Sequence, residues 1–80
     1  MNRPTMTDAQ KLKANKKILQ QLQQELFDFK DNTKAIPEKY IKMFPTKDAA
    51  WIRHTMIRAR EADVLNYQGI IESYEARLTS

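Results

Sequence analysis

The sequence contains no cysteine, a single histidine and a single glycine among its 80 residues. Without cysteine the chain forms no disulfide bonds and offers no thiolate to a metal, and nothing in it points to an oxidising compartment. One histidine, His54, is too few for a metal cluster built on histidines. One glycine excludes the glycine-rich loops that hold nucleotide phosphates. These absences remove most classes of metal, redox and nucleotide-hydrolysing site.

Long apolar runs are also missing, and none approaches the roughly 18 residues that a membrane-spanning helix needs. The first ten residues, MNRPTMTDAQ, lack the apolar core of a signal peptide. We therefore expect a cytoplasmic protein without a membrane segment. The length suits one domain over residues 1–80, of which we expect residues 1–7 to be disordered.

The first long helix is predicted over residues 8–32. Thr7 and Gln10 have the spacing of a capping box, and Asp8 suits the positive end of a helix dipole. Apolar residues then recur in the pattern of a heptad seam, with Asn15 at its one polar position. The apolar seam residues are Leu12, Leu19, Leu22, Leu26 and Phe29.

Two further helices are predicted over residues 37–44 and 47–78. Pro37 suits a first helical turn, whereas Pro45 ends the short segment. The only glycine, Gly69, lies inside the last helix, where we expect a neighbouring helix to approach closely. Because no strand-like alternation is sustained, the predicted fold is an all-α antiparallel hairpin of two long helices with a short helix in the connector.

The last helix mixes charged and apolar residues on one surface. Ile57, Val64, Ile71 and Leu78 recur every seven residues, and a second row with the same interval contains Arg53, Arg60, Tyr67 and Tyr74. One hypothesis gives the arginines structural roles, with their heads in water or paired to Asp63, Asp28 or Glu25. The other makes the second row a groove for a small anionic ligand such as a nucleotide.

A hairpin of this size leaves large apolar side chains uncovered. We expect partial exposure of Trp51, Leu65, Ile18 and Phe27 and of much of the segment 40–44. Small chains are marginal as isolated domains, and heptad seams are a common means of helix association. We therefore predict a homo-oligomer, a dimer or larger.

The net charge of +4 is unevenly distributed. The balance is +2 over residues 1–32, +3 over residues 33–47 and −1 over residues 48–80. Nucleic-acid binding through lysines is therefore one alternative function. A hairpin, however, places the two lysine groups at opposite ends. The candidate residues for this function are Lys11, Lys13, Lys16, Lys17, Lys39 and Lys42.

Catalysis is not indicated, and we predict no catalytic residue, metal site or cofactor. His54 is expected on the solvated face of the last helix, and the carboxylates show no paired spacing. By elimination we expect a small binding protein that acts stoichiometrically on a partner macromolecule, most simply a protein, as an inhibitor, adaptor or anti-regulator. Its binding surface, or alternatively a core that closes the hairpin end, consists of Tyr40, Ile41, Met43, Phe44 and Trp51.

Overall fold

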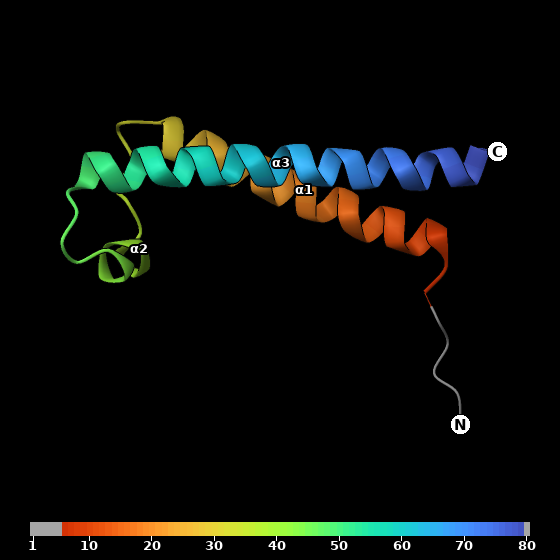
Figure 1. The fold of residues 1–80 in the computed structure, drawn as a ribbon, viewed down its shortest axis with the longest axis horizontal. Coiled ribbons are helices and arrows are strands. Elements are labelled where there is room, and N and C mark those ends of the chain that lie inside the picture. The colour runs from red at the N-terminus through yellow and green to blue at the C-terminus, as the bar shows by residue number, and fades with distance from the viewer. Residues whose placement is uncertain (1–5, 80) are drawn as a thin grey trace, which may run out of the picture.

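The computed structural model describes residues 6–79, which contain helices and connecting turns but no strand. The elements are α1 (Asp8–Lys30), α2 (Glu38–Met43) and α3 (Ala49–Thr79). Figure 1 shows α1 and α3 running antiparallel and crossing, with α2 beside the beginning of α3. The predicted all-α fold with two long helices and one short helix is confirmed. Of residues 1–7, for which disorder is expected, residues 1–5 lie outside the described range.

Local side-chain chemistry sets both ends of α1. The Thr7 hydroxyl accepts from the Gln10 N–H at 3.1 Å, and the Gln10 side chain accepts from the Thr7 N–H at 2.9 Å. This is the predicted capping box. The helix ends at Lys30 rather than at residue 32, because the Asp31 carboxylate accepts from the backbone N–H and the hydroxyl of Thr33. Those bonds favour a turn over further helix.

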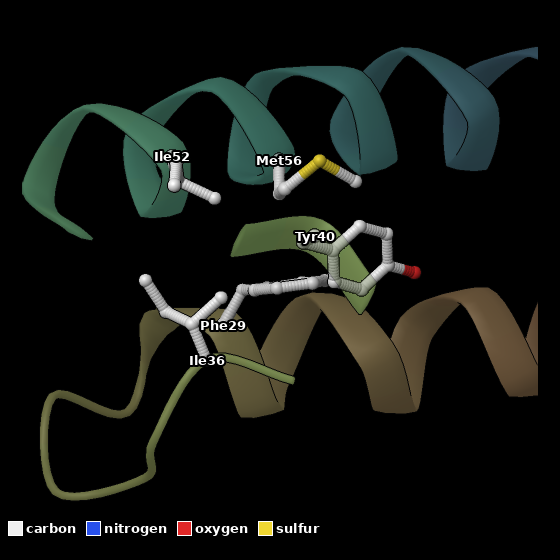
Figure 2. Close-up of a cluster of buried hydrophobic side chains, with 5 residues drawn as sticks. All are labelled: Phe29, Ile36, Tyr40, Ile52 and Met56. Carbon is white, nitrogen blue, oxygen red and sulfur yellow. The ribbon is translucent and has the colours of Figure 1, made fainter. Parts of the chain in front are cut away.

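The core lies at the connector end of the hairpin. Figure 2 shows five buried side chains facing one another, contributed by α1, the connector, α2 and α3. The Phe29 and Tyr40 rings meet edge to face, with their centroids 5.4 Å apart. Each large apolar side chain buried in this way stabilises the fold by about 1.5–3 kcal/mol. The members are Phe29, Ile36, Tyr40, Ile52 and Met56.

Away from this core the hairpin is only partly closed. The seam leucines of α1 are half-buried, and on α3 the sole fully buried side chain beyond the core, among residues 6–79, is Ile71. The partial exposure predicted for a single hairpin is confirmed. The uncovered large side chains include Ile18, Phe27, Ile41, Met43, Trp51 and Leu65.

Gly69 does not mark a close helix contact within the chain, contrary to our expectation. A Cβ atom placed on Gly69 meets no neighbouring heavy atom within 4 Å. The reason is that Gly69 is exposed and lies on the side of α3 that faces away from α1.

Candidate functional site

The connector end carries an exposed apolar surface. Ile41 and Met43 of α2 are 45% and 63% exposed, and Trp51 in the first turn of α3 is 39% exposed. Phe44 follows α2 and joins them to α3, because its ring meets that of Trp51 with centroids 5.2 Å apart. We call Ile41, Met43, Phe44 and Trp51 the end surface. Of the five residues predicted as a partner surface, Phe44 and Trp51 are therefore in ring contact, and Ile41, Met43 and Trp51 are exposed.

Tyr40, the fifth of these residues, belongs to the core instead. It is 8% exposed, packs on Phe29 and points into the buried cluster (Figure 2). Since Tyr40 and Phe44 are four residues apart, they lie on the same side of the chain and turn towards α1 and α3. Ile41 and Met43 lie on the sides of α2 that do not face the core, and they remain exposed. The core interpretation of this segment therefore holds for Tyr40, whereas the partner surface stays a prediction.

Lysines surround the end surface. Lys47 Nζ lies 5.0 Å from the centroid of the Trp51 ring, and Lys39 Nζ lies 5.0 Å from that of Tyr40. Lys42 pairs with Glu38 at 3.6 Å, with both side chains largely exposed. Residues 33–47 contain four lysines and one acidic residue, so the segment that carries most of the end surface has a net positive charge. An apolar patch on such a segment suits a partner that combines apolar anchors with acidic groups.

Arg53 ties α3 to the end of α1 and to the connector. Its Nη1 donates to the carbonyl oxygens of Phe29 at 2.7 Å and of Asp31 at 3.1 Å. Its Nη2 donates to the carbonyl oxygen of Lys34 at 2.5 Å. The guanidinium therefore caps the final turn of α1, whose carbonyls have no partners within the helix. Both Nη atoms of Arg53 therefore donate hydrogen bonds within the chain.

Arg60 joins all three helices. Its Nε donates to Glu25 Oε2 of α1 at 2.6 Å, its Nη2 to the Tyr40 hydroxyl of α2 at 3.1 Å, and its Nη1 to Asp63 Oδ2 at 3.1 Å. Burial lowers the pKa of Arg60, but the Tyr40 hydroxyl and the Glu25 carboxylate outweigh burial, and the pKa lies above its usual value. Arg60 remains a fixed positive charge inside this network.

The four residues of the alternative anion groove do not converge. Arg53 and Tyr74 are 21 positions apart on α3, or about 32 Å at the rise of an α-helix. Tyr67 and Tyr74 are half-buried beside α1, and the Tyr74 ring lies under the guanidinium of Arg77 at 5.2 Å. The structure therefore brings Arg53 and Arg60 to the connector end and leaves the tyrosines further along the hairpin.

A cavity of about 220 Å³ opens beside the connector. It is lined by groups of both signs, among them Glu25, Asp28, Lys34, Lys39 and Arg53. Asp28 and Lys34 pair at 2.7 Å, and this hydrogen bond lowers the pKa of Asp28 and raises the pKa of Lys34. With Glu25 held by Arg60, most of the charge in this cavity is already matched within the chain.

The two lysine groups lie at opposite ends of the molecule, as Figure 1 shows for the beginning of α1 and for α2. Lys13, Lys16 and Lys17 line a shallow depression on the outer side of α1, together with Met6 and Gln10. Lys11 is half-buried, and Lys16 pairs with Glu75 of α3 at 3.4 Å. Lys39 and Lys42 lie on α2, so the six residues form no single stripe along one side.

Sites of other kinds are not found in the described part of the chain. Within residues 6–79, no three histidine, cysteine, aspartate or glutamate side chains come together where they could hold a metal ion. His54 is exposed on α3. None of the helices described has both the length and the apolar character needed to cross a membrane.

Neither a protein-family model, nor a curated protein, nor a solved structure matches the chain. The geometry of the residues themselves therefore carries the functional argument.

Two features of this end were not identified from the sequence. The carbonyl acceptors of Arg53 carry no side-chain signature, so their role is visible only in the fold. Lys47, by contrast, lies four residues before Trp51, a spacing that brings side chains together around a helix start. From this spacing, the position of a lysine over the Trp51 ring could have been predicted.

Proposed function

We propose that the protein is a non-enzymatic binding protein that acts stoichiometrically on a partner macromolecule, as an inhibitor, adaptor or anti-regulator. The observation that supports the proposal is the end surface, where Ile41, Met43 and Trp51 are all exposed at the connector end of the hairpin and Lys47 lies over the Trp51 ring. Aromatic residues and methionine are enriched at the centres of protein interfaces, and exposed apolar patches with polar rims mark interaction sites.

The partner best suited to this surface is a protein segment with apolar anchors among acidic residues. Its anchors would cover Met43 and Ile41, and its carboxylates would meet Lys39, Lys42 and Lys47. We also infer that the chain associates with further copies of itself, since the hairpin alone leaves its seam half-exposed. The cytoplasmic location remains a prediction from the sequence.

The two alternative functions receive less support from the geometry. A receptor for a small anionic ligand needs free guanidinium groups, whereas Arg53 and Arg60 make their hydrogen bonds within the chain. Nucleic-acid binding gains from a continuous basic stripe, whereas the lysines lie at two ends. We therefore keep protein binding as the proposed function.

The test uses tagged wild-type protein as bait in a lysate of cells that produce it. We compare Ile41→Ser with Met43→Ser in one chain against the control Met6→Ser, which also replaces an exposed apolar residue. Wild type and control are expected to retain one protein in stoichiometric amount, and the double variant to lose it. Calorimetry with the purified pair then gives the stoichiometry.

Equal retention by all three baits would refute the end surface as the binding site. A melting shift with nucleotides, or DNA retardation that disappears between about 50 and 200 mM salt, would favour one of the alternatives instead.

A further inference from the structure

The methionines within residues 6–79 differ in their exposure to solvent. Met43, the last residue of α2, is 63% exposed, and Met6, which precedes α1, is 50% exposed. Met56 of α3 is 7% exposed and belongs to the buried cluster that Figure 2 shows. The exposed fraction of Met43 is therefore about nine times that of Met56.

An exposed methionine can be modified, because its thioether sulfur reacts with peroxides. The sulfur donates an electron pair to one oxygen atom of hydrogen peroxide, so that an S–O bond forms and the O–O bond breaks. The departing hydroxide takes the proton of the transferred hydroxyl group, and the products are a sulfoxide and water. Sulfur loses two electrons in this step, and the peroxide gains them.

Oxidation changes the polarity of the Met43 side chain at a position that belongs to the end surface. Methionine is apolar and flexible, whereas its sulfoxide is polar and chiral. Methionine is enriched at protein interfaces, where its flexible apolar side chain adapts to the partner. A sulfoxide at position 43 therefore removes an apolar contact next to Phe44, whose ring meets that of Trp51.

The fold separates this reaction from the stability of the core. Because Met43 is largely exposed, a polar sulfur there leaves the buried cluster unchanged. Met56 packs in that cluster with Phe29, Tyr40 and Ile52, where a sulfoxide would be buried without a hydrogen-bond partner and would cost stability. Oxidant reaches Met56 only when the connector end opens.

Met6 provides an internal comparison. It is exposed as well, but it lines the depression on α1 with Lys13 and Lys17. The beginning of α1 and the end surface lie at opposite ends of the hairpin, as Figure 1 shows for α1 and α2. Oxidation of Met6 should therefore leave the end surface unaltered.

We propose that Met43 is a site of reversible oxidation on the native fold, and that its sulfoxide weakens binding of the partner protein at the end surface. The oxidant is a peroxide, and methionine sulfoxide reductases, one for each epimer of the sulfoxide, restore the thioether. The effect on binding rests on the proposed function, whereas the site of oxidation does not.

The first measurement follows the purified chain over time in hydrogen peroxide. Proteolysis and mass spectrometry give the rate of oxidation at each methionine. Met43 is expected to be oxidised about tenfold faster than Met56, in line with their exposed fractions. Circular dichroism should show unchanged helices and an unchanged Tm after oxidation of Met43, and treatment with the reductases should return the sulfoxide to the thioether.

The second measurement repeats the lysate experiment with baits from which the peroxide has been removed after treatment. The variants Met43→Leu and Met6→Leu keep an apolar side chain of similar volume but lack the sulfur. Treated wild type and treated Met6→Leu are expected to retain about fivefold less partner than before treatment. Treated Met43→Leu should retain as much as before, and the reductases should restore retention by the wild type.

The outcomes separate this proposal from the proposed function. Equal rates of oxidation at Met43 and Met56, or loss of helix as Met43 is oxidised, would overturn Met43 as a site on the native fold. Full retention of the partner by wild type with oxidised Met43 would overturn the effect on binding and leave the proposed function standing. A wild-type bait that retains no protein even before treatment would overturn the proposed function and the effect on binding, while the rates still decide the site of oxidation.

Discussion

At the scale of single residues, Arg53 joins the beginning of α3 to the end of α1 and to the connector. Its guanidinium reaches carbonyls of α1 and the connector that lie 19 to 24 positions earlier in the chain. Those carbonyls include acceptors that α1 itself cannot satisfy. A charged donor shared among three carbonyls is therefore a structural element of the fold. Its replacement removes the donor from the Phe29 and Lys34 carbonyls, while the Asp31 carbonyl keeps the Lys34 N–H.

Arg53→Ala is expected to lower the free energy of unfolding by about 2 kcal/mol, because hydrogen bonds to charged groups contribute about 1.5–3 kcal/mol. Urea denaturation followed by circular dichroism measures the change. Arg58→Ala, also on α3 but exposed, is the control and should stay within about 0.5 kcal/mol of wild type. Similar values for the two variants would contradict a structural role for Arg53.

At the level of individual residues, contacts between two charged side chains could be predicted from the sequence. Glu25 and Asp63 were named as partners for the arginines, and Arg60 contacts both. The partners of Arg53 were not found, because backbone carbonyls exist at every position and only the fold selects three of them. Tyr40 was ambiguous for a similar reason, since an apolar ring suits a core and an interface equally.

At the scale of elements, α3 contains a glycine, and no neighbouring side chain packs against it. Gly69 is exposed, and no atom lies within 4 Å of the place where a Cβ would stand. Glycine in a helix interior costs about 1 kcal/mol relative to alanine through its backbone entropy. Nothing within the described chain offsets this cost.

Gly69→Ala is therefore expected to stabilise the protein by about 1 kcal/mol and to raise its Tm by roughly 4–8 °C. Ala62→Gly, seven residues earlier on the same exposed side, is the matched control and should lower the Tm by a similar amount. Thermal melts by circular dichroism measure both. A lower Tm for Gly69→Ala would indicate that another chain packs against this position.

The helices themselves were predictable because their signals are local. The capping box at Thr7, the heptad spacing and the prolines that bound α2 each act within a few residues. The position of the core was less predictable. The seam runs the whole length of α1, but burial also needs Ile36 and α2 to cover it, and only the connector end receives that cover.

At the scale of the whole molecule, the elongated shape bears on stability. The chain measures 47 × 31 × 18 Å, with a radius of gyration of 16.7 Å, whereas about 11.6 Å is usual for a compact domain of this length. A single hairpin of this shape buries few side chains fully, and its stability should depend on association.

The Tm is therefore expected to rise with protein concentration, because a dimer is favoured by mass action. Scanning calorimetry between about 5 and 500 μM, a hundredfold range, measures the shift. A Tm independent of concentration in the wild type would show that the monomer alone accounts for the stability.

The unequal closure of the hairpin also has a consequence for its internal motion. The Arg53 and Arg60 networks and the buried cluster all lie at the connector end. Near the free ends, α1 and α3 are joined by the exposed ion pair between Lys16 and Glu75. Backbone amides should therefore exchange with solvent in a gradient, slowly near Phe29 and Met56 and quickly towards Gln10 and Arg77. The free ends can separate and close again without disturbing the surface at the connector.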